Sequence, residues 1–301
     1  MERKTENRYI NLLTDFGFKR VFGEKDIMMA FLTDLLQPKS PIADITFLDK
    51  ELGGMSEYER GVVYDLLCHS EDGTDFIVEM QNRSQAYFSD RILYYLSRSF
   101  SEQGVKGDAK WNYRLTPVYG IFFLNFHLSG FRPLSVRTVQ LKVDETGELF
   151  SDKLKVFTLE LPDYRTKTEA DCTTQIDYWL YNITNLETMT KNIPFQHEQP
   201  IFGKVGNIAE LIHMTAEERQ KYNISIDTYR TNLAVMQNER AEGWAEGHAE
   251  GRAEGRAEGE AIDMQKGERQ KALSIAQSLK AIGMSPSQIA QLTGLDEADL
   301  A

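Results

Sequence analysis

Residues 118–126, with the sequence VYGIFFLNF, place the strongest constraint on the fold because almost every one of their side chains is apolar. A strand of this kind is typical of a sheet that helices cover on both faces. Periodicity and turn residues indicate further elements along the chain. The expected helices cover 8–36, 87–103, 173–190 and 204–213, and the expected strands cover 42–48, 61–70, 74–81, 140–143 and 154–161. The sequence therefore predicts an α/β fold followed by a helical C-terminal region.

Changes in composition divide the chain into four expected segments. Residues 1–160 form the α/β core, and residues 161–240 form a helical extension. Residues 241–270 begin with five Ala-Glu-Gly-x repeats, and residues 271–301 return to ordinary composition as a small helical tail.

The Ala-Glu-Gly repeat has a period of four residues, close to the 3.6 residues of a helical turn. On a helix its glycines form a stripe of small residues that lets two helices approach closely, so one interpretation is a dimerisation helix. Each Gly costs about 1 kcal/mol of helix stability relative to Ala, so the other interpretation is a flexible acidic tether.

The tail contains a helix-start signal at Ser285 and Pro286. It resembles a small helix-turn-helix unit, whose second helix would enter the major groove of DNA. The tail is not basic, however, so a dimerisation or partner-docking bundle is the alternative. We expect a homo-oligomer, specifically a dimer, that forms through the C-terminal region.

Composition also limits the compartment and the partners. The two cysteines, Cys68 and Cys172, are too few for a disulfide framework and indicate a reducing compartment. No stretch approaches 18 apolar residues and no secretory leader follows Met1, so we expect a cytoplasmic protein without a membrane partner. The net charge of −12 argues against general nucleic-acid binding. Residues 83–142 nevertheless carry nine Lys or Arg against three Asp or Glu, which is either a phosphate-binding surface or a chance fluctuation.

Two acidic residues are symmetric about a predicted hairpin turn. The turn is centred on Asp72, and Asp65 and Glu79 lie seven residues before and after it. In this antiparallel register the two carboxylates lie opposite each other, and Gln81 lies on the same face by the strand period of two. A bulge of one residue would put the two acids on different faces.

Opposed like charges destabilise a sheet, and burial increases the penalty. A divalent cation offsets this repulsion, and oxygen ligands without a Cys or His cluster favour Mg²⁺ or Mn²⁺. Asp65 and Glu79 are therefore the expected metal ligands, at a site that could activate water and stabilise charge on a phosphate. The alternative is an exposed strand that carries acids by chance.

Five segments occur in a characteristic order. They are TDFGFKRVFG near the N-terminus, a strand with Asp65, VEMQ at 78–81, RILYYLSRSF at 91–100 and PVYGIFFLNF at 117–126. This ordered set resembles the Rpn family of bacterial recombination-promoting nucleases and transposase-like proteins. The resemblance covers residues 8–160 and continues in style into the repeats and the tail. It implies a PD-(D/E)XK nuclease core, with a mixed central sheet flanked by helices, that cleaves DNA with a divalent metal.

The resemblance assigns the family's core Asp to Asp65 and the acid of its (D/E)-x-K strand to Glu79. Gln81 takes the third position, where the wider superfamily has Lys and this family usually has Gln. Gln can hydrogen-bond the attacking water but carries no charge, which predicts slow or tightly conditional cleavage, with loss of catalysis as the alternative. Such cores often receive an extra acid from their first helix, which makes Asp15, with Lys19 one turn later, an accessory candidate. The alternative for Asp15 is a helix cap or an ion pair with Lys19.

Arg91 and Arg98 share one face of the predicted helix 87–103 with Tyr94 and Tyr95. We expect the two arginines to contact DNA beside the site. In the alternative interpretation the tyrosines pack in the core and the arginines extend to water.

The predicted activity is a Mg²⁺-dependent DNA endonuclease that hydrolyses phosphodiester bonds and promotes recombination, or acts in a mobile-element or defence setting. One alternative is a non-catalytic DNA-binding or regulatory module that retains the nuclease fold. The other is a structural oligomerisation protein. A metal-binding measurement combined with a plasmid-nicking assay separates the three.

Overall fold

The computed structural model describes residues 7–39, 42–48, 51–52, 62–104 and 112–296. The chain divides into two compact units, Met1–Asn232 and Leu233–Ala301. The helices are α1 (Asp15–Phe22), α2 (Lys25–Leu36), α3 (Phe88–Glu102), α4 (Gln175–Asn185), α5 (Ile201–Ala209), α6 (Ala216–Ala281) and α7 (Pro286–Thr293). The strands are β1 (Ile45–Phe47), β2 (Glu51–Leu52), β3 (Val62–Val63), β4 (Leu66–Ser70), β5 (Asp75–Gln81), β6 (Val118–Leu124), β7 (Val136–Lys142) and β8 (Leu149–Glu160).

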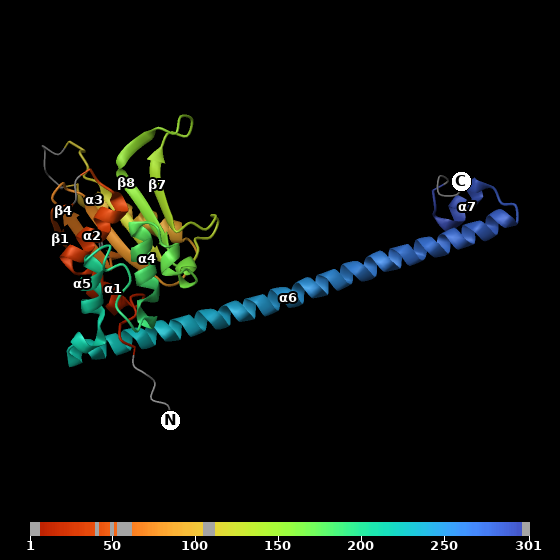
Figure 1. The fold of residues 1–301 in the computed structure, drawn as a ribbon. Coiled ribbons are helices and arrows are strands. Elements are labelled where there is room, and N and C mark those ends of the chain that lie inside the picture. The colour runs from red at the N-terminus through yellow and green to blue at the C-terminus, as the bar shows by residue number, and fades with distance from the viewer. Residues whose placement is uncertain (1–6, 40–41, 49–50, 53–61, 105–111, 297–301) are drawn as a thin grey trace, which may run out of the picture. The chain divides into compact units, whose positions relative to one another are not determined.

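A six-stranded mixed sheet forms the centre of the first unit, with the strand order β1-β4-β5-β6-β8-β7 (Figure 1). Strands β1, β4 and β5 are antiparallel neighbours, β5, β6 and β8 run parallel, and β7 is antiparallel to β8. Strand β6 is the apolar segment from which the fold was predicted, and it is almost entirely buried. The predicted α/β fold with a mixed central sheet and a helical C-terminal region is confirmed. The short pair β2–β3 was not predicted.

Alternate residues of the sheet pack into two separate cores, because successive side chains on a strand point to opposite faces. Val78 and Phe123 lie on the face that packs against α1, α2, α4 and α5 (Figure 1). Ile77 and Phe122 lie on the opposite face, which packs against α3. Helices α4 and α5 fall in the predicted extension 161–240, yet they contribute to the same core as α1 and α2.

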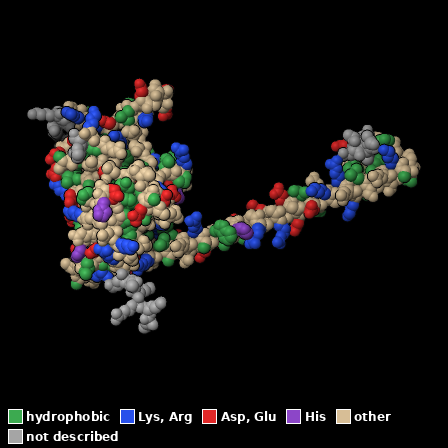
Figure 2. Space-filling model, in the orientation of Figure 1, with side chains coloured by type: hydrophobic (Ala, Val, Ile, Leu, Met, Phe, Trp, Pro, Cys, Tyr) green, Lys and Arg blue, Asp and Glu red, His purple; other side chains and the backbone are tan. Residues whose placement is uncertain are grey.

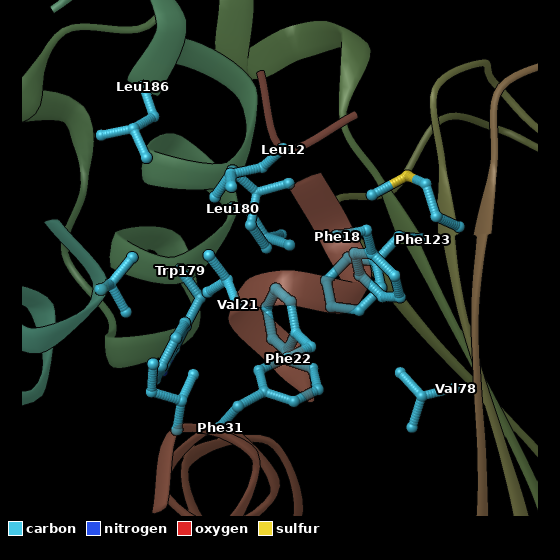
Figure 3. Close-up of a cluster of buried hydrophobic side chains, with 14 of the residues drawn as sticks. Leu12, Phe18, Val21, Phe22, Phe31, Val78, Phe123, Trp179, Leu180 and Leu186 are labelled. Atoms are coloured by element: carbon cyan, nitrogen blue, oxygen red, sulfur yellow. The ribbon is translucent and has the colours of Figure 1, made fainter. Parts of the chain in front are cut away.

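Aromatic side chains fix α1 against the sheet. The rings of Phe18 and Phe22 stack with centroids 4.8 Å apart, and each lies 5.4 Å from the ring of Phe123 on β6. Phe31 of α2 and Trp179 of α4 complete this cluster (Figure 3). Offset and edge-to-face aromatic pairs contribute beyond the area they bury, so the position of α1 is well determined.

A close backbone approach fixes the start of α1. Thr14 caps the helix, and its Oγ1 accepts a hydrogen bond from the Gly17 N–H at 3.0 Å. A Cβ atom at position 17 would lie 2.2 Å from the carbonyl oxygen of Asn11, so only Gly fits there. The same turn carries Lys19, whose side chain therefore starts from a rigid backbone.

Helix α6 has 66 residues, and the Ala-Glu-Gly repeat lies within it. Tyr222 and Ile226, near its start, are buried in the core of the first unit. In the second unit Ala276 of α6 and Ile289 of α7 are buried. On the face that Figure 2 shows, acidic and basic side chains are mixed along α6. The structure thus gives the repeat as helix, and its pairing with a second copy stays a prediction.

Candidate active site

The hairpin register predicted from the turn is present in the structure. Strands β4 and β5 pair Leu66 with Val78 and His69 with Asp75, symmetrically about residue 72. Asp65 directly precedes β4, at the position opposite Glu79. The expected continuous strand 61–70 is wrong in one detail. The chain bends at Asp65, and β3 pairs with β2 in a separate two-stranded sheet.

Each of the two carboxylates accepts a hydrogen bond from the backbone of the opposite segment. Glu79 Oε1 accepts from the Asp65 N–H at 3.0 Å, and Asp65 Oδ2 accepts from the Met80 N–H at 2.9 Å. Gln81 Nε2 donates to Glu79 Oε2 at 2.9 Å. These side-chain hydrogen bonds extend the pairing of β4 and β5 to Asp65, which directly precedes the first residue of β4. They bring the three predicted site residues together at the carboxyl end of β5.

Glu79 is the most buried member of this group, with 2% of its surface exposed. Burial and the nearby charge of Asp65 raise the pKa of Glu79 to about 8, although hydrogen bonds from the Asp65 N–H and from Gln81 act in the opposite direction. A carboxyl group with a pKa shifted by burial and by a specific charged partner is a candidate for function.

Lys19 places a positive charge beside Asp65. Its Nζ lies 3.4 Å from Asp65 Oδ1 and also donates to the carboxylate of Asp15, one turn earlier in α1. Burial lowers the pKa of Lys19, but the hydrogen bond to Asp15 and the charge of Asp65 outweigh it and raise the pKa overall. Of the two accessory candidates, Lys19 reaches the carboxylate pair. Asp15, with 66% of its side chain exposed, forms the ion pair with Lys19.

The two arginines of α3 have different surroundings. Arg91 Nη1 lies 3.5 Å from Gln81 Oε1 and 3.2 Å from Gln85 Oε1, so the guanidinium group contacts the site on the side away from Lys19. Arg98 is only 8% exposed, and its Nη2 donates to Glu102 Oε1 at 3.2 Å. Arg91 therefore borders the site, whereas Arg98 is engaged within α3.

A second buried charged cluster lies on the same face of the sheet and was not predicted. Glu160, at the end of β8, is fully buried, and its carboxylate lies 2.8 Å from His127 Nδ1 and 3.3 Å from Arg137 Nη1. The strand registers place Glu160 beside Leu124, and Leu124 beside Gln81. Nothing in the pattern of the strand 154–161 distinguishes Glu160 from an exposed residue at a strand end.

The oxygen atoms at the site fit a hard divalent cation. Asp65 and Glu79 offer carboxylate oxygens and Gln81 an amide oxygen, which suit Mg²⁺ or Mn²⁺. The closeness of buried Glu79 to partly buried Asp65 is an independent reason to expect a cation. Among the described residues, no group of three or more His, Cys, Asp or Glu could hold a metal. The chain would therefore supply two carboxylates, and water and substrate phosphate would complete the coordination, as is common for Mg²⁺.

The fold and the carboxylate pair together define a nuclease-type α/β protein. The model of the PD-(D/E)XK nuclease family transposases matches residues 12–239, a range that contains the six-stranded sheet and every residue of the candidate site. The chain belongs to this family, which confirms the predicted resemblance to recombination-promoting nucleases and transposases. No curated protein and no solved structure matches it. In the described part of the chain, no helix has the length and apolar character that a membrane span requires.

Proposed function

We propose that this chain is a metal-dependent DNA endonuclease that hydrolyses phosphodiester bonds. The observation that best supports the proposal is the reciprocal pair of Asp65 and Glu79, in which each carboxylate is held by a backbone N–H of the opposite segment. Such bonds hold two acids close together where Glu79 is buried and Asp65 is partly buried, an arrangement that is costly when both are ionised and that a bound cation would offset. Membership of a nuclease family supports DNA as the substrate.

Each residue of the site has a distinct proposed role. Asp65 and Glu79 would hold the divalent ion, and the amide of Gln81, which has both a donor and an acceptor, would orient the attacking water. When bound, a divalent ion lowers the pKa of coordinated water and stabilises negative charge on the phosphate.

Two cations of the chain would support the same reaction. Lys19 lies beside Asp65, and Arg91 contacts Gln81 from α3. Positive groups fixed in advance beside a phosphate stabilise the charge that develops in the transition state. We propose that Lys19 and Arg91 together supply the charge that a Lys at position 81 supplies in the wider superfamily.

Nicking of supercoiled plasmid in Mg²⁺ or Mn²⁺ tests the proposal with the variants Asp65→Asn and Asp152→Asn. Asp152 is a matched control, because it lies in the first part of β8, away from the site, with 64% of its side chain exposed. We expect wild type and Asp152→Asn to nick the plasmid and Asp65→Asn to be inactive. Full activity of Asp65→Asn would refute the site assignment.

A non-catalytic DNA-binding or regulatory module is the second candidate, and one observation favours it. The amide of Gln81 is already engaged on both sides, by Glu79 Oε2 and by Arg91 Nη1, so it must rearrange before it can position a water. A rise in the thermal midpoint with Mg²⁺ that Asp65→Asn lacks, without any nicking by the wild type, would select this candidate. Recombination in a mobile-element or defence setting is the biological context that we propose for the nuclease.

A further inference from the structure

Tyr87 presents an exposed ring at the start of α3. Its surface is 80% exposed, and its backbone has a left-handed conformation with φ 61°. A bulky residue seldom adopts this conformation, and it persists only where surrounding contacts hold the chain in place. The neighbouring residue supplies such contacts. Phe88 is buried, with its ring 6.1 Å from that of Phe122 and 5.6 Å from that of Phe126.

These contacts fix the backbone of Tyr87 at the side of the sheet that carries the proposed catalytic residues. Phe122 is the residue of β6 that pairs with Glu79 on β5. The contact of Phe88 with Phe122 therefore fixes the start of α3 on the face of the sheet that carries Glu79. Only five residues separate Tyr87 from Gln81, the last residue of β5. Tyr87 is therefore attached at a short distance along the chain from both the end of β5 and the buried anchor Phe88.

Arg91 and Tyr95 share one face of α3, because residues four apart in a helix are neighbours, and Tyr87 is the residue that directly precedes the helix. The Arg91 N–H donates to the Tyr87 carbonyl oxygen at 3.0 Å. The guanidinium group of Arg91 lies 4.9 Å from the centre of the Tyr95 ring, and its Nη2 donates to the Tyr95 hydroxyl at 2.8 Å. The backbone of Tyr87, which carries an exposed ring, thus lies one helical turn before Arg91, a cation that is held in place and that contacts Gln81.

We propose that Tyr87 stacks against an unpaired base while Arg91 binds the adjacent phosphate, so that the preferred substrate is DNA with a single-stranded stretch at the cleavage point. This inference rests on the proposed nuclease function and names its substrate class. The bases of paired DNA are stacked on each other and offer no free face, whereas single strands bind to proteins by stacking on aromatic rings beside basic groups.

The first test measures binding of the full chain without divalent metal. The probes are a fluorescein-labelled dT oligonucleotide and a blunt duplex, and fluorescence anisotropy gives the two dissociation constants. The variant Tyr87→Asn removes the ring while keeping a residue that tolerates the left-handed conformation. We expect it to lower the preference for the single strand by about tenfold or more, which is the usual effect of losing one stacking partner. Tyr87→Trp should retain the preference.

Tyr113 provides a matched control. It is also 80% exposed and also has φ 61°, but it precedes β6 and so lies at the opposite end of that strand from the site. Tyr113→Asn should leave the preference unchanged. An equal loss in Tyr113→Asn, or no loss in Tyr87→Asn with an unchanged thermal midpoint, would overturn the inference.

The second test compares cleavage of a paired duplex with that of a duplex containing an unpaired bubble, in Mg²⁺. Faster cleavage at the bubble by the wild type, with the preference lost in Tyr87→Asn, supports the inference. Equal cleavage of both duplexes by the wild type and by Tyr87→Asn overturns it and leaves the nuclease proposal intact. Single-strand binding that depends on Tyr87, without any cleavage, supports the stacking role and refutes the nuclease proposal.

Discussion

Replacing Glu79 with Gln removes a buried ionisable group but keeps the shape of the side chain and an acceptor for the Asp65 N–H. In metal-free protein we expect Glu79→Gln to raise the free energy of unfolding, because burial and the charge of Asp65 oppose ionisation of Glu79. We also expect the variant to be inactive as a nuclease, since it loses one of the two proposed metal ligands. Greater stability and lost activity would then have the same cause.

The size of the effect follows from the pKa of Glu79. Folding raises it from 4.5 to about 8. In the unfolded chain, pH 7 lies about two and a half units above the pKa of Glu79, so the residue is ionised. In the folded chain Glu79 is still largely protonated at this pH. The difference destabilises the folded chain by about 3 kcal/mol, at 1.36 kcal/mol for each unit. Below pH 4.5 Glu79 is protonated in both the folded and the unfolded chain, so its burial carries no penalty for folding. The penalty grows as pH rises from 4.5 toward 8. The stabilisation by Glu79→Gln should therefore be near zero at pH 4 and about 2–3 kcal/mol at pH 7.

Urea unfolding in EDTA between pH 4 and pH 8 measures this difference. Glu71→Gln is the matched control, because Glu71 is an exposed acid in the turn between β4 and β5, and its substitution should change stability by less than about 0.5 kcal/mol. Mg²⁺ should then raise the unfolding midpoint of the wild type but not that of Glu79→Gln. A Glu79→Gln variant with wild-type stability at every pH would refute the raised pKa of Glu79 and the cost of ionising it beside Asp65.

Three further predictions concern Lys19, Gln81 and helix α6. Lys19→Met should lower the nicking rate by about 10²-fold while Lys19→Arg keeps most of it, and an unchanged rate in Lys19→Met would remove Lys19 from the site. Gln81→Lys should preserve the fold and raise the single-turnover nicking rate, by up to about 10²-fold, or alter the preference between Mg²⁺ and Mn²⁺. An unchanged rate and metal dependence would show that residue 81 does not face the reacting phosphate. Truncation after residue 240 should leave a folded first unit by circular dichroism, whereas truncation after residue 215 removes Tyr222 and Ile226 from the core and should yield unfolded or aggregated protein. Equal folding of both truncations would contradict the packing of α6.

The sequence was informative wherever the structure depends on local periodicity. The turn centre and the strand period of two were enough to place Asp65, Glu79 and Gln81 together, because register in a short hairpin is a local property. The approach of Lys19 to Asp65 depends on how α1 packs on the sheet, and that packing follows from long-range aromatic contacts. The burial of Glu160 depends on β7, a strand whose extent no local signal defines. Helix propensity is a weak guide over the Gly-rich part of α6, so the choice between helix and tether needed the structure.

The hydrogen bonds between the two carboxylates and the opposing backbone bear on how this family diverges. Asp65 and Glu79 satisfy the backbone N–H groups of Met80 and Asp65, so the acids close the hairpin whether or not the chain turns over DNA. A relative that has lost catalysis would still need an acceptor oxygen at each position, which Asn and Gln also provide. We therefore expect decayed members of the family to drift to amides at these two positions rather than to apolar residues.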